Sequence, residues 1–394
     1  MDSKILRTIE EVEKIKSDWE RLETVAPWVS YFSTYRYNIE WFKQYEGDNS
    51  VSLYVPVVIH NQEIVGIAPL QIRQKKGHGL SYKELQFIHG GGDYSNFLVH
   101  PSVSAEPSKI VNELLNQITT DCDEYDSISL THICQFSLLA HQLLISKDNN
   151  RLKYLIECPY IDFSKYPSYE AYTKAYIPKK VKQYINRFKR EVDYRIEVTD
   201  RNVISDLAKI HIAEKDYLQS KGLVQRHSFF EEPREMAFRE VLYTNNANVL
   251  TYLIIDNATN DIICYYTGYV WNEIFHSVTT AYNPKYANLA VGKIFNYMIF
   301  EENYIRPRWR IFDMGTGRYS WKFEMTDTFN LLYQYKKTCF SSKKQMVGTV
   351  INIVDYFTMI SAILNIKSTR KMLFFTTFAH NYPPNNNSKK ASYN

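Results

Sequence analysis

Hydrophobic residues follow the same layout in two distant parts of the chain. Residues 57–70, VVIHNQEIVGIAPL, read as an apolar strand, a polar turn at Asn61-Gln62 and a second apolar strand. Residues 253–266, LIIDNATNDIICYY, repeat this order around an Asn-rich turn. Apolar runs joined by a short polar turn are typical of β-hairpins. Each hairpin follows a region of helical periodicity and precedes a further strand and helix, so the sequence predicts two similar lobes.

The predicted fold is α+β, and each lobe has a mixed, mostly antiparallel sheet flanked by helices. We expect an N-terminal lobe over residues 1–165 and a C-terminal lobe over residues 166–345. A helical extension over residues 346–380 and a disordered tail over residues 381–394 are expected to follow.

The expected extension begins with an apolar stretch, MVGTVINIVDYFTMISAIL, over residues 346–364. A membrane span needs about 20 apolar residues, and Asp355 in the middle of this stretch opposes one. We expect a helix docked on the protein, with peripheral contact at the inner face of a membrane as the alternative.

The net charge and the spacing of the cysteines argue against several classes of protein. The net charge of +4 on 90 charged residues is too small to indicate DNA binding. The five cysteines form no CxxC pair, so neither a zinc site nor a disulfide framework is expected. The charged N-terminal segment has no apolar core of the kind found in signal peptides. A cytoplasmic protein without a metal is the expectation.

A single glycine stands where a predicted strand leads into a predicted helix. The strand FHSVTTAY, residues 275–282, is followed by a turn at Asn283-Pro284, and Gly292 lies at the start of the helix. The first N–H groups of a helix lack internal partners and carry partial positive charge, which suits a phosphate group. Gly292 therefore indicates either tight packing or a phosphate-binding loop. The apolar side of the helix is expected to carry Ile294, Tyr297, Met298 and Ile299.

A second polar group follows the next predicted strand. The segment WRIFDMG reads as a strand that ends at Asp313, and Gly315 and Gly317 then form a loop. A glycine at a helix start, with polar residues at the end of the next strand, is a recognised geometry for ligand sites. The polar and aromatic residues after the loop are Arg318, Tyr319, Trp321 and Lys322.

Together these segments resemble the GNAT superfamily of N-acyltransferases. The similarity is to its two-lobed branch, which includes FemAB-type aminoacyl transferases and the CelD-like proteins of exopolysaccharide clusters. It covers about residues 15–340 and is carried by ELQFIHGGGDYSNFLV, AYNPKYANLAVGKIF and FDMGTGRYSWKF. Ala290-Val291 replaces the usual Ser-Pro before the glycine, and Trp321 replaces the usual tyrosine before the lysine. These departures keep the reaction class and bear on the identity of the acyl donor.

The resemblance implies acyl transfer from a thioester, most simply acetyl-CoA, to an amine or hydroxyl group. In this family a strand offers backbone N–H groups to the thioester and the pantetheine arm, and the next helix start holds the pyrophosphate. The acceptor implied is a sugar precursor of a surface polysaccharide. The donor-binding residues implied on this chain are Thr279, Ala281, Tyr282, Ala290, Val291, Gly292 and Lys293.

The catalytic residues expected are Asp313 and Lys322. Asp313 is the first candidate for the base that takes the acceptor's proton, and Lys322 for stabilising negative charge or binding the acceptor. His89 and His276 are the alternative bases, although a lone histidine is more often structural. The acceptor is expected to contact Asp93, Tyr94, Arg318, Tyr319 and Trp321.

Two other functions remain open. One is FemAB-like transfer from aminoacyl-tRNA to a peptidoglycan precursor, which would call for a charged helical hairpin that the sequence lacks, so tRNA is not the expected partner. The other is a non-catalytic lobe pair that binds a glycan or a partner protein. The basic run PKKVKQYINRFKR, residues 178–190, is either a solvated helix face or a surface for a nucleotide, a pyrophosphate or tRNA.

Overall fold

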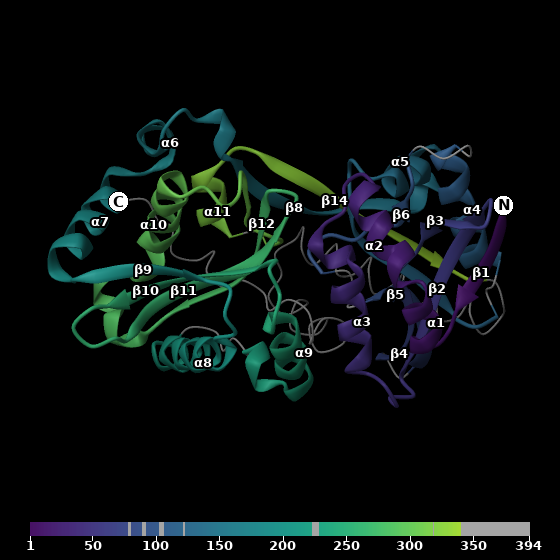
Figure 1. The fold of residues 1–394 in the computed structure, drawn as a ribbon, viewed down its shortest axis with the longest axis horizontal. Helices are drawn as coiled ribbons and strands as arrows, with labels where there is room; N and C mark the ends of the chain where they lie inside the picture. Colours follow the sequence, from purple (N-terminus) through teal and green to yellow (C-terminus); the bar gives the residue numbers. More distant parts are fainter. Residues whose placement is uncertain are drawn as a thin grey trace, which may run out of the picture. The chain divides into compact units, whose positions relative to one another are not determined.

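The structure is a computed structural model of the 394-residue chain. It describes residues 1–77, 80–88, 92–101, 106–120, 123–222, 228–317 and 319–339 (Figure 1). The apolar stretch 346–364 and the expected extension and tail lie outside these residues. Within them, no helix is both long and apolar enough to cross a membrane.

The chain folds into two compact units that alternate along the sequence. Unit 1 takes Met1–Val29, Tyr45–Tyr154 and the chain from Tyr333 on, and unit 2 takes Ser30–Gln44 and Leu155–Leu332. The sequence led us to expect one boundary near residue 165. Instead the chain crosses between units inside two strands, β8 (Leu152–Asp162) and β14 (Phe329–Thr338), and an early segment belongs to the later unit.

Unit 1 has a sheet with the strand order β6-β3-β2-β4-β5-β7. Its predicted hairpin is confirmed, because β2 pairs antiparallel with β3 across Asn61 and Gln62. Both turn residues have positive φ, 49° and 68°, as a two-residue hairpin turn requires. The strands are β1 (Asp2–Leu6), β2 (Val51–His60), β3 (Glu63–Ile67), β4 (Leu70–Gly77), β5 (Leu80–Phe87), β6 (Leu98–Val99) and β7 (Ser127–Cys134); the helices are α1 (Ile9–Lys14), α2 (Lys16–Val25), α4 (Pro107–Thr120) and α5 (Leu138–Ile145).

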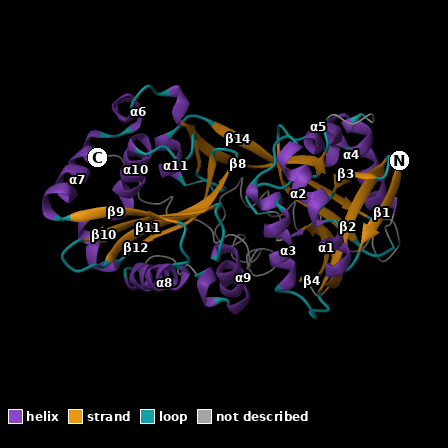
Figure 2. Cartoon of the chain, viewed as in Figure 1, coloured by secondary structure: helices purple, strands orange, loops and turns teal. Residues whose placement is uncertain are grey.

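Unit 2 has the strand order β8-β13-β12-β11-β10-β9, and only β12 and β13 are parallel in the pairings from β13 to β9. Helices α6, α7 and α10 lie on one face of this sheet, and α8 and α9 lie on the other (Figure 2). The strands are β9 (Tyr194–Thr199), β10 (Val249–Asp256), β11 (Ile262–Trp271), β12 (Ile274–Tyr282) and β13 (Ile311–Asp313); the helices are α3 (Tyr35–Lys43), α6 (Tyr169–Tyr176), α7 (Lys179–Glu191), α8 (Ile204–Ser220), α9 (Pro233–Tyr243), α10 (Val291–Ile305) and α11 (Ser320–Met325).

The core of unit 2 lies between the sheet and α10. The apolar side predicted for this helix is confirmed, since Ile294, Tyr297, Met298 and Ile299 are all buried. They pack in one cluster with Phe275 of β12 and Phe312 of β13, whose rings stack at 5.4 Å. This packing fixes the start of α10 relative to β12. The α+β class and the mostly antiparallel sheets predicted from the sequence are thereby confirmed.

Candidate active site

Strand β12 is paired along its whole length on one side only. It pairs with β11 from Ile274 to Tyr282, whereas its pairing with β13 covers only Ile274–His276. Beyond His276 this pairing stops, because β13 ends at Asp313. No described strand pairs with the edge of β12 from Ser277 to Tyr282 on this side, and this unpaired edge next to β13 is called the opening below. It includes the predicted donor residues Thr279, Ala281 and Tyr282.

A β-bulge lies where the opening begins. Thr267 pairs with Thr279 and Gly268 with Ser277, so Val278 is the extra residue on β12. A Cβ atom on Gly268 would stand 2.2 Å from the carbonyl oxygen of His276, so only glycine permits this approach of the strands. Bulges re-aim backbone groups and are common beside active sites.

The side chain of Glu214, from α8, reaches the end of the same edge. Its Oε1 atom accepts a hydrogen bond from the backbone N–H of Tyr282 at 3.3 Å. Its Oε2 atom accepts one from Lys215 at 2.8 Å, and the glutamate is 7% exposed. The carboxylate therefore sits at a backbone N–H that the resemblance assigns to the acyl donor. No local pattern in the sequence marks this residue, since it comes from a helix 68 positions earlier in the chain.

The loop between β12 and α10 brings together the other predicted donor residues. Ala290 lies in the left-handed region at φ 57° and is the N-cap of α10, without a side-chain cap hydrogen bond. A left-handed alanine costs about 1–3 kcal/mol, and such strain concentrates at functional sites. Val291 is buried, whereas Gly292 and Lys293 are exposed at the helix start.

The structure gives no packing reason for glycine at position 292. Its φ is not positive, unlike that of Gly315 or Gly317. A Cβ atom there would come no closer than 3.4 Å to its nearest neighbour, the ring of Tyr282, which is close to ordinary contact. Glycine at this position therefore leaves open space in front of the first N–H groups of the helix.

Asp313 and His276 lie side by side at the end of the parallel pairing. They occupy the same register position on β13 and β12, which places the histidine Nδ1 atom 3.8 Å from the Asp313 Oδ2 atom. Both are nearly fully buried, at 3% and 4% exposure. The edge of the Phe32 ring covers the imidazole at 5.7 Å between centroids. From the sequence, His276 is expected only as an alternative general base. In the structure it lies next to Asp313, the first candidate for that base.

The charge of the Asp313 carboxylate also affects the pKa of a tyrosine on β11. Tyr266 donates to or accepts from the Ser277 hydroxyl at 3.1 Å. Burial, and secondarily the negative charge of Asp313, raises the pKa of Tyr266 to about 12. The phenol therefore keeps its proton at neutral pH and does not act as a base.

Lys322 holds the loop that follows Asp313. Its ammonium group donates to the carbonyl oxygens of Met314, Gly315 and Thr316 at 2.6, 2.9 and 2.7 Å. These three bonds match the three N–H groups of a lysine. Asp313 accepts from the Gly315 N–H at 2.7 Å, so the aspartate and the lysine fix the same loop.

The remaining predicted residues divide between the units. Tyr319 and Trp321 stack at 6.5 Å, and the Lys322 ammonium lies 5.7 and 5.8 Å from their ring centroids. Asp93 and Tyr94 lie in unit 1, where Asp93 raises and burial more strongly lowers the pKa of His132. Arg318 and the other alternative base, His89, lie outside the described residues.

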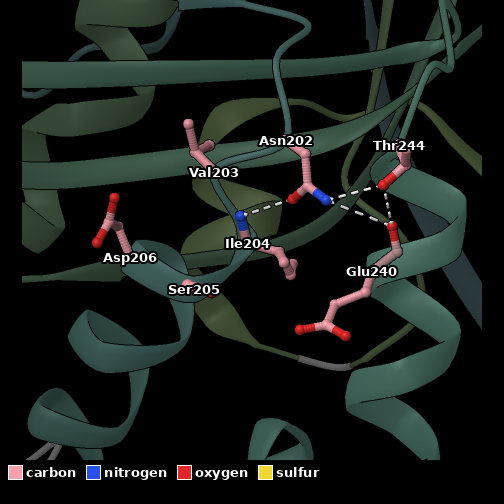
Figure 3. Close-up of a pocket in the computed structure, with 7 residues that line it drawn as sticks. All are labelled: Asn202, Val203, Ile204, Ser205, Asp206, Glu240 and Thr244. Atoms are coloured by element: carbon pink, nitrogen blue, oxygen red, sulfur yellow. Dashed lines mark hydrogen bonds between the residues drawn. The ribbon is translucent and has the colours of Figure 1, made fainter.

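Two pockets of unit 2, each of about 390 Å³, share no residue with this group. Figure 3 shows the first, where Asn202 joins the start of α8 to the end of α9 through Thr244 at 2.9 Å. The second is lined by Phe163, Trp309 and Arg310 among others. Over the part of the chain that the structure describes, no group of three or more His, Cys, Asp or Glu side chains is arranged to hold a metal ion.

Comparison with known proteins gives a domain model that matches part of the chain and a fold that matches most of it. Residues 178–323 match the model of the acetyltransferase (GNAT) domain. This segment contains β9–β13 and both predicted catalytic residues. No curated protein sequence matches the chain.

Solved structures match most of the chain at low identity. The crystal structure of FemX has a TM-score of 0.56 at 10% identity, and the match covers 89% of this chain and all of FemX. A C-terminal domain of a putative lysylphosphatidylglycerol synthetase from Agrobacterium fabrum gives 0.48 at 9% identity over 88% of this chain and 98% of that domain. A tandem GNAT protein from the clavulanic acid biosynthesis pathway gives 0.43 at 11% identity over 86% and 100%. The FemX match shows a shared fold alone.

Proposed function

We propose that unit 2, in which residues 178–323 match the model of the acetyltransferase (GNAT) domain, transfers an acyl group, most simply acetyl, from acyl-CoA to an amine or hydroxyl group. The supporting observation is Gly292. It stands exposed at the start of α10, and neither its backbone angle nor its packing calls for glycine. A binding site for the donor's pyrophosphate explains the open space, since phosphate groups bind at helix starts.

The opening between β12 and β13 supplies the rest of the donor site. Backbone N–H groups of β12 beyond the Val278 bulge bind the thioester and the pantetheine arm along the strand edge. The acceptor nitrogen or oxygen attacks the thioester carbonyl carbon, the C–S bond breaks, and the CoA thiolate leaves and takes up a proton. N–H groups held in place by the bulge stabilise the oxyanion of the intermediate.

The pair of Asp313 and His276 removes the acceptor's proton. His276 takes the proton and Asp313 stabilises the resulting imidazolium, for which its Oδ2 atom at 3.8 Å from Nδ1 is well placed. Lys322 acts through the Met314–Thr316 loop, which it holds by three hydrogen bonds. The acceptor is a sugar precursor of a surface polysaccharide, bound with the help of Tyr319 and Trp321.

Glu214 favours a second candidate function. A carboxylate at the donor edge would pair with the α-ammonium group of the aminoacyl donor in a FemAB-like transfer from aminoacyl-tRNA. Replacement by Gln separates the two functions. Glu214→Gln is expected to leave acetyl-CoA binding intact or improve it, and to weaken binding of an aminoacyl donor.

Calorimetry of acetyl-CoA with wild type, Gly292→Asp and Gly292→Ala tests the proposal. The aspartate puts a negative charge where the pyrophosphate is expected, so binding should fall below detection. The alanine puts only a neutral Cβ atom into the same space, 3.4 Å from Tyr282, so it should weaken binding less than the aspartate does, and thermal unfolding should be unchanged in both variants. A folded wild type that binds no acyl-CoA would overturn the proposal in favour of the aminoacyl donor.

A further inference from the structure

Helix α5 of unit 1 carries apolar side chains on both of its faces. Leu139, Ala140 and Leu143 are buried in the core of this unit, where α5 packs beside α4 (Figure 1). On the outer face Leu144 and Ile145 are 49% and 64% exposed. A helix that is apolar all round is normally buried, and grouped apolar side chains at a surface mark interaction sites. We therefore expect the outer face of α5 to contact a partner.

Two stacked aromatic rings extend the exposed apolar surface at the start of this helix. Phe136, two residues before Leu138, is 49% exposed. The ring of Trp28, which is 53% exposed, stacks on it at 4.6 Å between centroids. An eight-residue helix is about 12 Å long, so one partner surface can reach both rings and the exposed residues of the last turn. We call Trp28, Phe136, Leu144 and Ile145 the apolar surface of unit 1.

The backbone of Trp28 shows that folding alone does not favour this exposed position. Its φ is 58°, in the left-handed region that bulky side chains rarely adopt. The preceding residue is held by Asn96, which is 4% exposed and donates a hydrogen bond from Nδ2 to the Pro27 carbonyl oxygen at 3.4 Å. Backbone strain of this kind is concentrated at functional sites. The exposed indole is thus better explained by a partner than by the stability of unit 1.

The charged groups around the end of α5 leave an excess of positive charge. Lys147 and Lys153 are exposed, and neither forms an ion pair within the described part of the chain. Between residues 136 and 154 the sequence has one acidic residue, Asp148, which pairs with Lys337 at 2.9 Å and Arg151 at 3.2 Å. Chiefly the hydrogen bond from Lys337 holds the pKa of Asp148 below its usual range, so this carboxylate is ionised and already compensated. A partner with an anionic surface and an apolar interior complements both features.

We propose that unit 1 docks on the surface of an anionic lipid bilayer through its apolar surface and these two lysines. Tryptophan is favoured at the boundary between membrane and water, and the apolar side chains of an interfacial helix reach the region between headgroups and acyl chains. The ammonium groups of Lys147 and Lys153 bind lipid phosphates, while their stems lie along apolar side chains. The surface belongs to unit 1 and the proposed transfer site to unit 2, so the inference goes beyond the proposed function and does not depend on it.

Co-sedimentation of the 394-residue chain with lipid vesicles tests the docking surface. Wild type is expected to bind vesicles that contain phosphatidylglycerol, and to bind vesicles of phosphatidylcholine alone about tenfold or more weakly. Ile145→Gln removes the most exposed side chain of the apolar surface and should weaken binding to the anionic vesicles about tenfold or more. Lys147→Gln and Lys153→Gln should each weaken it about fivefold.

The matched controls lie in unit 2. Ile305→Gln replaces an apolar side chain that is 68% exposed, and Lys165→Gln removes an exposed lysine. Both should bind the vesicles as wild type does, and thermal unfolding should be unchanged in all of these variants. Fluorescence gives a second readout, because the difference in emission between wild type and Trp28→Phe should shift to shorter wavelengths when anionic vesicles are added.

Three results would overturn the docking surface. If wild type binds neither kind of vesicle, a lipid surface is excluded, and self-association that Ile145→Gln abolishes would then assign the apolar surface to a second copy of the chain. If Ile145→Gln binds as wild type does, the membrane contact lies elsewhere, for example in the apolar stretch 346–364. Equal weakening by Lys147→Gln and Lys165→Gln would show a general attraction of positive charge rather than a site. Acyl transfer to a soluble acceptor should be unaffected in every variant, so failure here leaves the proposed function standing.

Discussion

Asp313, at the end of β13, has a central part in the proton transfer proposed for this protein. Asp313 is fixed by the Gly315 N–H on one oxygen and faces His276 with the other. The two oxygens therefore have separate tasks, one in holding the loop and one beside the imidazole.

Asp313→Asn separates these tasks. The amide oxygen still accepts from the Gly315 N–H, but the negative charge that stabilises the imidazolium is gone. We expect kcat to fall by about 10²–10⁴-fold, the usual contribution of acid–base catalysis, with acetyl-CoA affinity unchanged. Release of the CoA thiol with amino-sugar acceptors measures kcat. Activity within threefold of wild type would exclude the aspartate from proton transfer.

Lys322→Met tests the lysine as the holder of a loop. The Lys322 side chain is 4% exposed, so the variant leaves three buried carbonyl oxygens without a hydrogen-bond donor. We therefore expect the free energy of unfolding to fall by roughly 2–4 kcal/mol. Urea denaturation measures the loss. The exposed Lys165→Met is the control and should change stability by less than about 0.5 kcal/mol. A stable but inactive Lys322→Met would instead favour direct contact with the reacting atoms.

Helix α8 brings buried polar groups to the face of the sheet opposite α10. Its His211 is 6% exposed and shares a hydrogen bond of 2.7 Å with the Ser228 hydroxyl. Burial, and then the charges of Lys215 and Arg239, lowers the pKa of His211 to about 3. The histidine is thus held neutral in the folded state.

This neutral histidine makes the stability of unit 2 depend on pH. Below the ordinary histidine pKa of about 6.5 the unfolded chain binds a proton that the folded chain does not, so stability is lost as pH falls from about 6.5 toward 3. The expected slope is about 1.4 kcal/mol per pH unit. His211→Asn removes the titrating group, and denaturation between pH 4 and 7 should show a correspondingly flatter slope. An unchanged slope would mean that the histidine is protonated in the folded protein.

Elements were easier to predict than the contacts between them. The hairpin at Asn61, the strand ending at Asp313 and the helix after Gly292 each have a local signal in periodicity and turn residues. The neighbourhood of His276 and Asp313 has no such signal, because it depends on parallel pairing across an intervening helix. Glu214 was missed for the same reason, since helical periodicity cannot tell which strand edge a buried carboxylate reaches.

At the scale of the whole molecule, the early segment Ser30–Gln44 belongs to unit 2. Tyr31 stacks on Tyr269 of β11 at 4.1 Å, and Trp41 meets the ring of Phe238 from α9 at 5.1 Å. The aromatic pattern of this segment cannot tell which of the two cores the helix joins, because both cores offer apolar surface.

A fragment made of residues 155–332 alone should therefore be incomplete. It would expose the rings of Tyr269 and Phe238 to water, and we expect it to unfold without a cooperative transition. The same fragment joined through a flexible linker to residues 30–44 should unfold cooperatively. Thermal unfolding followed by near-UV circular dichroism compares them, and equal cooperativity would show that α3 is dispensable to unit 2.

The interleaving of the two units also sets when the protein can fold during synthesis. The core of unit 1 includes Tyr335 and Cys339, so this unit is incomplete until almost all of the described chain has left the ribosome. Unit 2 begins with Ser30 and ends with Leu332, so it too must wait. Domains of most proteins fold one after another from the N-terminus as they are made. Here neither unit can precede the other by much, and the nascent chain should depend on chaperones for most of its translation.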